Sequence, residues 1–283
     1  MSINIIVDCN YLCYVCRFAL SQGLTYRGSH TEIIFGFLRH ILILAEHFES
    51  NNFYFCWDSK ESVRKELYPK YKANRRPDTR SQEEKELDII AFKQFNELRE
   101  KILPELGFRN IFMVEGYESD DLIAILVKKL EGSNIVVASD NDLLQLLSFC
   151  SLYNISKKQL TTKKEFIRKY SIQPETWSEV KALSGCTSDN VSGIPGVGEK
   201  TAIKFLTGEL TQGKVFSKIH ESGEIRDRNR LLVSLPLKDI PLPIYKENIL
   251  LKSTFLGVFS IYGLVSMSQE KEFMKWVRIF NLK

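Results

Sequence analysis

Four short apolar runs, each followed by an acidic residue, most constrain the fold of this 283-residue chain. The runs cover residues 3–7, 52–57, 109–114 and 134–138. Each has the length and composition of a buried strand. Amphipathic helical patterns separate them, at residues 34–48, 87–102 and 122–130. Strands that alternate with helices predict an α/β fold, with a mostly parallel twisted sheet and flanking helices.

The strand pattern stops after about residue 173, and short helices and turns follow. We therefore expect a core at residues 1–175 and a second, helical region at 176–283. No run approaches the roughly 18 apolar residues that a membrane helix needs. The N-terminus also lacks the features of a secretory signal. We expect a cytoplasmic protein without a membrane partner.

A basic segment follows Asp58 directly. Residues 59–80 carry eight Lys or Arg against three acids, a net charge of +5, whereas the rest of the chain sums to −1. Cations and an aromatic alternate there, at Lys70, Tyr71, Lys72, Arg75 and Arg76. Cations neutralise phosphates and a tyrosine can stack on an unpaired base. A solvated loop is an equally good interpretation of the segment alone, but its place beside Asp58 favours guiding a nucleic-acid strand.

Acidic residues fall where the predicted strands end. Helix capping explains some of them singly, but parallel strands bring their carboxyl ends to one edge of the sheet. Clustered carboxylates repel one another unless cations neutralise them, and oxygen ligands without His select Mg²⁺ or Mn²⁺. Two ions about 4 Å apart activate water for phosphodiester cleavage. The acidic residues are Asp8, Asp58, Glu118, Asp120, Asp121, Asp140 and Asp142.

A glycine-rich turn, GIPGVG at residues 193–198, precedes a predicted helix start. Glycines let a backbone approach a phosphate closely, and amides at a helix start bind one. The spacing is not that of a nucleotide-binding P-loop. A plain tight turn is the alternative for this stretch alone. Asp189 lies a few residues before it, which would tie duplex gripping to the acidic site.

In combination, six motifs resemble the 5′-nuclease family: flap endonucleases, phage 5′–3′ exonucleases and the 5′-nuclease domain of polymerase I. The resemblance spans about residues 5–206, with a weaker echo at 230–236. Phage-type members are the most similar, since no polymerase domain follows. The motifs are VDCNYL (7–12), FCWD (55–58), VRKELYPKYKANRRP (63–77), GYESDDLIA (116–124), ASDNDLLQLL (138–147) and SDNVSGIPGVGEKTA (188–202).

The resemblance implies a PIN-like core, a helical arch at about residues 59–82, and a helix–three-turn–helix in the C-terminal part. It also implies hydrolysis dependent on Mg²⁺ or Mn²⁺, with two or more ions. The substrates would be DNA with a 5′ flap, nick or frayed end, and RNA primers on DNA, in replication or repair. Replication proteins would be partners.

The resemblance also assigns roles by motif. Arg75 or Arg76 would assist Lys72, which would contact the scissile phosphate. Lys70 and Tyr71 would contact DNA in the arch. The first metal would be held by Asp8, Asp58, Glu118 and Asp120, and the second by Asp121, Asp140, Asp142 and Asp189. The turn would hold duplex phosphates, together with a K⁺ ion, through Gly193, Gly196, Gly198 and Lys200.

Cys186 departs from the family pattern. Relatives usually read G-D-x-x-D-N where this chain reads GCTSDN at residues 185–190. A thiol is a soft ligand, poorly suited to Mg²⁺, so we expect weakened binding of the second metal. Two alternatives stay open: a relative that binds branched DNA without cutting it, and a PIN-type ribonuclease, which normally lacks the arch and the hairpin.

Overall fold

The computed structural model describes residues 2–19, 23–75 and 81–283, and its centre is a six-stranded sheet. The four predicted strands are confirmed, and five of the six strands are parallel, with only the last antiparallel to its neighbour. A mostly parallel sheet with flanking helices is therefore correct. The strand order is β5 (Ile111–Phe112), β4 (Phe53–Cys56), β1 (Ile3–Asp8), β6 (Ser133–Val137), β7 (Ser151–Asn154) and β8 (Gln159–Thr161).

The central strand β1 pairs with β4 and β6 and is buried along its middle. Successive side chains of a strand point to opposite faces. Ile5 and Val7 accordingly belong to one hydrophobic core, whereas Ile6 belongs to another. Two apolar layers explain why the strand reads as a continuous apolar run rather than as an alternating one.

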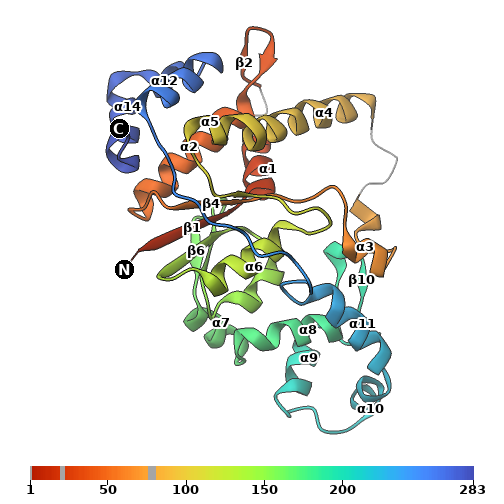
Figure 1. The fold of residues 1–283 in the computed structure, drawn as a ribbon. Helices are drawn as coiled ribbons and strands as arrows, with labels where there is room; N and C mark the ends of the chain where they lie inside the picture. The colour runs from red at the N-terminus through yellow and green to blue at the C-terminus, as the bar shows by residue number, and fades with distance from the viewer. Residues whose placement is uncertain (1, 20–22, 76–80) are drawn as a thin grey trace.

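Helices from both ends of the chain cover the first face of the sheet (Figure 1). The predicted helix at 87–102 is a regular helix followed by a π-helical segment and one further turn. The elements on this face are α1 (Cys9–Ala19), α2 (Glu32–His47), α4 (Gln82–Glu97), the π-helical segment Leu98–Ile102, α5 (Leu103–Leu106), α12 (Lys252–Ile261), α13 (Val265–Ser268) and α14 (Glu270–Phe280).

Middle segments of the chain cover the second face, among them the predicted helix at 122–130. The elements here are α6 (Ser119–Lys129), the 3-10 helix Asn141–Leu146, α7 (Lys163–Tyr170), α8 (Trp177–Ser184), α9 (Glu199–Leu206), α10 (Lys214–Glu221) and α11 (Gly223–Val233). In Figure 1 the last of these helices form the end of the molecule that lies farthest from α12 and α14.

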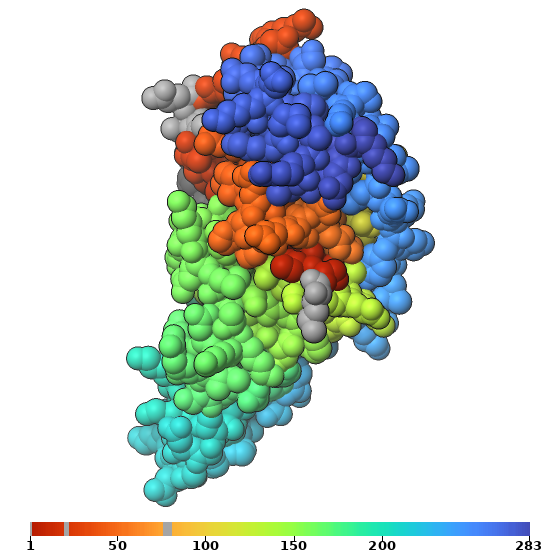
Figure 2. Space-filling model, turned by 90° about the vertical axis from the view of Figure 1, so that its left-hand side faces the viewer, coloured from red at the N-terminus to blue at the C-terminus, as the bar shows by residue number. Residues whose placement is uncertain are grey.

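The C-terminal helices are anchored by aromatic packing. The ring of Phe280 lies 5.9 Å from that of Phe53 on β4, and Phe255 contacts both Phe108 and Trp276. Figure 2 shows this blue C-terminal segment against the orange segment that contains α2. The predicted region 176–283 therefore contributes to both faces of the sheet.

The basic segment folds into two short helical pieces, α3 (Val63–Leu67) and the 3-10 helix Ala73–Arg75. The part of the predicted arch that contains Arg76 lies outside the described residues, and α4 follows it. Two small hairpins were not predicted: β2 (Thr25–Tyr26) with β3 (Ser29–His30), and β9 (Gly185–Cys186) with β10 (Val191–Ser192). Among the described helices, none has the length and apolarity needed to cross a bilayer.

Candidate active site

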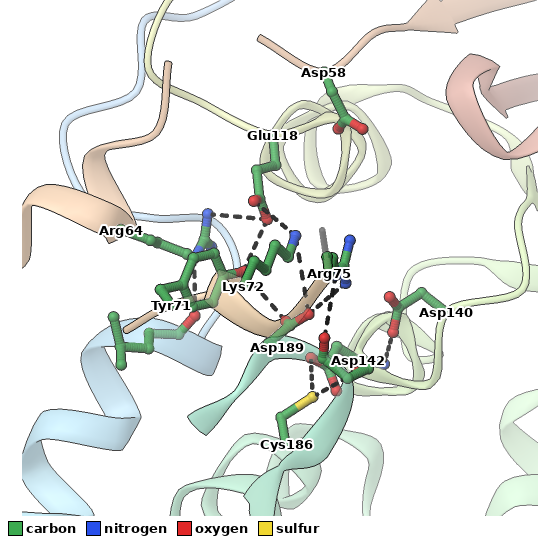
Figure 3. A network of polar contacts seen from close by, with 12 residues as sticks. Asp58, Arg64, Tyr71, Lys72, Arg75, Glu118, Asp140, Asp142, Cys186 and Asp189 are labelled. Carbon is green, nitrogen blue, oxygen red and sulfur yellow. Dashed lines mark hydrogen bonds and ion pairs between the residues drawn. The ribbon is translucent and has the colours of Figure 1, made fainter. Parts of the chain in front are cut away.

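Predicted acidic residues gather at the carboxyl edge of the parallel strands. Asp8 is the last residue of β1, and Asp58 and Asp140 follow the ends of β4 and β6. Backbone amides fix two of them: Tyr11 donates to Asp8 Oδ1 at 3.1 Å, and Ser119 donates to Asp58 Oδ1 at 2.8 Å. Figure 3 shows carboxylates from this edge together with that of Asp189.

Burial and mutual repulsion disfavour the charged forms of these carboxylates. Burial raises the pKa of Asp8 to about 7, and the charge of Asp58 adds to the shift. Burial also raises the pKa of Asp120 well above its ordinary value, with Asp140 and Asp8 contributing. The pKa of Asp142 rises to about 6 for the same reasons. These carboxylates cannot all be charged at once unless cations lie nearby. The cluster therefore suits the binding of divalent cations.

Glu118 is one of the acidic residues that cations of the basic segment already neutralise. Lys72 Nζ donates to Glu118 Oε1 at 2.7 Å, and a nitrogen of Arg64 lies 3.8 Å from Oε2. Burial would raise the pKa of Glu118, but Lys72 and Arg64 outweigh it and hold this pKa below its ordinary value. The arch cation that the family resemblance singled out therefore lies among the candidate metal ligands.

A backbone clamp fixes Lys72 against the turn that carries Asp189. The Lys72 backbone has φ +54°, a left-handed conformation uncommon for lysine, and its N–H donates to the Asp189 carbonyl at 2.8 Å. Asn190 donates its side-chain amide to the Lys70 carbonyl at 2.7 Å, and Arg75 Nη2 donates to Asp189 Oδ1 at 2.5 Å. The start of the arch and the Asp189 turn therefore form one unit.

Tyr71 takes a different place from the one predicted. Its side chain is 2% exposed, and its hydroxyl lies 3.0 Å from Glu118 Oε2 and 3.2 Å from Asp189 Oδ2. Burial and these two carboxylates raise the pKa of the phenol. The ring cannot stack on an unpaired base in this conformation, because it is buried in a hydrophobic cluster with Ala182, Val191 and Leu232.

Asp121 is also committed elsewhere. Two nitrogens of Arg64 donate to its two carboxylate oxygens, and the backbone N–H of Leu237 donates to Oδ1 at 2.7 Å. Arg64 also donates to the Leu232 carbonyl at 2.8 Å. Both side chains are buried. This pair joins α3, α6 and the segment after α11, so both carboxylate oxygens of Asp121 already have partners in this structure.

Cys186 lies beside the predicted second-metal residues. Its Sγ donates to Asp142 Oδ2 at 3.6 Å and lies 3.0 Å from the hydroxyl of Ser188. Burial, with Asp142 contributing, raises the pKa of the thiol to about 12. At neutral pH this position therefore carries no charge of its own.

The glycine turn divides into a packed and an open part. A Cβ on Gly193 would meet the Ser184 backbone at 2.2 Å, so this glycine allows two chain segments to touch. Gly196, at φ +87°, and Gly198, which caps α9, have open space around them. Lys200 is exposed in the first turn of that helix. The open part is the one that a phosphate could approach.

Two buried cations were missed from the sequence. Lys181 Nζ lies 3.7 Å from Asp142 Oδ1 and 3.0 Å from Glu199 Oε1. In the sequence, Lys181 lies on the same face of a helix as Trp177 and Ser184. An apolar residue is expected at such a position, so the lysine was the available signal. Arg64 offered no comparable signal, because its partners come from distant segments.

Relatives of this chain include nucleases and polymerases. A 5′–3′ exonuclease of Buchnera aphidicola is 29% identical over 275 residues, which cover 88% of this chain and 91% of that protein. A 5′–3′ exonuclease of Bacillus subtilis is 36% identical over 187 residues, 63% and 60% of the two chains. The thermostable DNA polymerase I of Thermus thermophilus is 34% identical over 206 residues, which cover 71% of this chain but only 23% of the polymerase.

Solved structures share the fold along nearly the whole chain. The bacteriophage T5 D15 flap endonuclease, solved with DNA and metal ions, matches with a TM-score of 0.70 at 21% identity, over 99% of this chain and 98% of that one. Flap endonuclease-1 of Methanococcus jannaschii matches with a TM-score of 0.60 at 16% identity, over 98% and 92%. Residues 4–171 match the family described as 5′–3′ exonuclease, N-terminal resolvase-like domain, and the chain belongs to this family.

Proposed function

We propose that this chain is a metal-dependent, structure-selective 5′-nuclease that hydrolyses phosphodiesters near the 5′ ends of branched or frayed DNA. The observation that carries the proposal is the meeting of Lys72 and Arg75 with a carboxylate cluster at one edge of the sheet. The cluster supplies oxygen donors for cations, and the two basic side chains supply donors for a phosphate.

The proposed ligands follow the resemblance, with Asp121 left out. Their chemistry fits Mg²⁺ or Mn²⁺, since all are oxygen donors and several have pKa values raised by burial and by one another's charge. Bound ions would activate a water and stabilise the leaving oxygen. The first ion would be held by Asp8, Asp58, Glu118 and Asp120, and the second by Asp140, Asp142 and Asp189.

Lys72 and Arg75 are proposed to contact the scissile phosphate. In this structure each binds a carboxylate, Glu118 or Asp189. Backbone hydrogen bonds hold the two residues in place independently of those side-chain contacts: the Lys72 N–H donates to the Asp189 carbonyl, and the Arg75 N–H donates to the Lys72 carbonyl. Their charged ends could therefore turn to a phosphate while the chain stays fixed. Arg76 remains a prediction from the resemblance.

The open half of the glycine turn is proposed to hold duplex backbone. The stretch that follows Asp189 carries Gly196, Gly198 and Lys200. The bound duplex backbone would therefore stay at a fixed distance from the carboxylate cluster. Lys70 is exposed and proposed to contact the incoming strand. Three further expectations rest on the resemblance alone: a K⁺ ion at the turn, RNA primers as further substrates, and replication proteins as partners. A cytoplasmic location stays an expectation from the sequence.

A cleavage assay tests the proposal. A duplex with a 5′ flap is incubated with the protein in Mg²⁺ or Mn²⁺, beside single-stranded RNA of matched length. Cleavage near the flap junction is expected, and it should require the added metal. Asp120→Asn should abolish cleavage while DNA binding persists, whereas the exposed Glu221→Gln should cut normally.

The alternatives appear as distinct outcomes of the same assay. The protein could bind the flap duplex, with an affinity that falls as the salt concentration rises, and yet not cleave it in Mg²⁺ or Mn²⁺. That result would indicate a relative that binds branched DNA without cutting it. Cys186, at a position where relatives usually carry an acid, is the observation that keeps this second candidate in view. Preferential cleavage of the single-stranded RNA would indicate a PIN-type ribonuclease.

A further inference from the structure

One end of the carboxylate cluster contains a sulfur donor. Asp142, Cys186 and Asp189 are all buried, and each offers one potential ligand atom within 4.8 Å of the other two. Figure 3 shows the sulfur of Cys186 next to the carboxylate of Asp142. One thiol with two carboxylates is a different donor set from the oxygen-only residues at the rest of this edge.

The geometry of these donors suits a small tetrahedral cation. Cys186 Sγ and Asp142 Oδ2 lie 3.6 Å apart. Two ligands 2.0–2.3 Å from a tetrahedral zinc ion are separated by about 3.6 Å. The pairing of Cys186 with Val191 fixes the backbone of the cysteine, and the same hairpin carries Asp189. The donors therefore approach the required spacing before any ion binds.

Asp142 supplies a second, independent indication of a ligand. Its side chain is 7% exposed, and its Oδ1 has no hydrogen-bond partner among the described residues. Lys181 Nζ lies 3.7 Å away, beyond hydrogen-bonding distance, and is closer to Glu199 at 3.0 Å. A buried carboxylate oxygen normally has a partner, and a cation bound beside Cys186 would provide one.

The neighbouring cations leave room for such an ion. Lys181 can keep its contact with Glu199 while an ion binds Asp142. Arg75, which pairs with Asp189, has a side chain that is 46% exposed and can withdraw toward solvent. Withdrawal of Arg75 would break the hydrogen bond from its Nε to the Ser188 carbonyl, but it would leave the bond from the Lys72 N–H to the Asp189 carbonyl in place.

We propose that Asp142, Cys186 and Asp189 form a mixed sulfur–oxygen site that binds a thiophilic divalent cation, Zn²⁺ in preference to Mg²⁺. The inference rests on the proposed function, since it specifies the second of its two metal positions. Thiolate ligands select zinc over magnesium. On binding, the S–H bond is replaced by a sulfur–metal bond and the proton passes to solvent, with no change of oxidation state.

Metal titrations without DNA test this proposal in the full chain. Zn²⁺ binding is measured by calorimetry, and Co²⁺ or Cd²⁺ binding by the sulfur-to-metal charge-transfer absorption. The unsubstituted protein should show a tight Zn²⁺ site and a charge-transfer band. Cys186→Ser should lose the band and weaken Zn²⁺ binding about 10–100-fold, since even outer-sphere changes have effects of this size. Cys150→Ser, which removes another buried thiol, should retain both.

Each result of these titrations either supports or overturns the proposed zinc site. A band that survives in Cys186→Ser, or displacement of Zn²⁺ by an equal concentration of Mg²⁺, would overturn the proposal. If Cys186→Ser does not fold, Asp142→Asn replaces it: loss of tight Zn²⁺ binding supports the site, and unchanged binding overturns it. Flap cleavage in Mg²⁺ is measured separately, so failure of zinc binding and failure of the proposed nuclease function are distinguishable.

Discussion

Two nitrogens of Arg64 donate to the two carboxylate oxygens of Asp121 at 2.6 and 2.8 Å, with both side chains almost fully buried. Arg64 comes from the start of the basic segment and Asp121 from the first turn of α6. The pair also contacts Leu232, in the segment whose sequence weakly resembles the family at residues 230–236, and Leu237, which directly follows that segment. It positions the arch start relative to Glu118, which is the N-cap of the same helix.

Removing one partner of this ion pair should destabilise the fold. Asp121→Ala leaves the buried Arg64 without its bidentate carboxylate partner, and we expect a loss of about 3–5 kcal/mol in the free energy of unfolding. Denaturant unfolding measures it. The double variant Arg64→Met with Asp121→Leu should recover most of that loss. An Asp121→Asn variant that keeps its stability yet loses metal affinity would show instead that Asp121 is a ligand.

The acidic cluster should make the metal-free protein less stable as the pH rises from about 5 to 7.5. Asp8, with its pKa raised to about 7, still binds a proton in the folded state at pH values where the unfolded chain has released it. The folded state thus binds more protons, and stability falls with pH. Asp8→Asn should gain stability relative to the unsubstituted protein over this range.

Thermal unfolding at several pH values, with and without Mg²⁺, measures the effect. Saturating Mg²⁺ should stabilise the unsubstituted protein more at pH 7.5 than at pH 5, because protons compete with the ion for the same oxygens. A metal-free difference between Asp8→Asn and the unsubstituted protein that shrinks as the pH rises would contradict the assigned repulsion.

Lys72→Met should slow cleavage with little effect on folding. The side chain is proposed to contact the scissile phosphate, and loss of one such donor typically lowers kcat by about 10²–10³-fold. Single-turnover cleavage of a 5′-flap duplex measures the rate, with affinity measured separately in Ca²⁺. Lys252→Met, an exposed lysine at the start of α12, is the matched control. Equal rates for the two variants would remove Lys72 from the mechanism.

Two glycines of one turn should respond differently to alanine. Gly198→Ala places a methyl group in open space at the start of α9, so it should weaken duplex binding while changing stability by only about 1 kcal/mol. Gly193→Ala drives a Cβ into the Ser184 backbone and should destabilise the protein markedly. Binding curves and unfolding curves of both variants separate the roles, and unchanged duplex affinity in Gly198→Ala would exclude phosphate contact at that glycine.

The pattern of short apolar runs and acidic residues predicted much of the fold. Strands β1, β4, β5 and β6 lie where the runs indicated, because buried parallel strands must be apolar on both faces. The convergence of Asp8, Asp58 and Asp140 also followed from the sequence, since the carboxyl ends of parallel strands share one edge. Strands β7 and β8 were not predicted because they are short and contain few apolar residues, and β8 lies at the edge of the sheet.

Contacts between distant segments could not be predicted in this way. In sequence, Asp120 and Asp121 are adjacent acids at a helix start and look equivalent. The fold turns one toward Asp8 and Asp140, and the other toward Arg64, which is 57 residues away along the chain. A local pattern specifies the helical face of a side chain, but its partner depends on how separate elements pack.

Tyr71 and Cys186 show the same division. The sequence by itself determined that an aromatic residue stands among basic ones and that a thiol replaces a usual acid. Only the tertiary structure decided that the Tyr71 hydroxyl donates to Glu118 and Asp189, and that the Cys186 sulfur faces Asp142 at 3.6 Å. The physical reason is that chemical type is a property of each residue, whereas burial, charge pairing and ligand geometry arise between residues that the fold brings together.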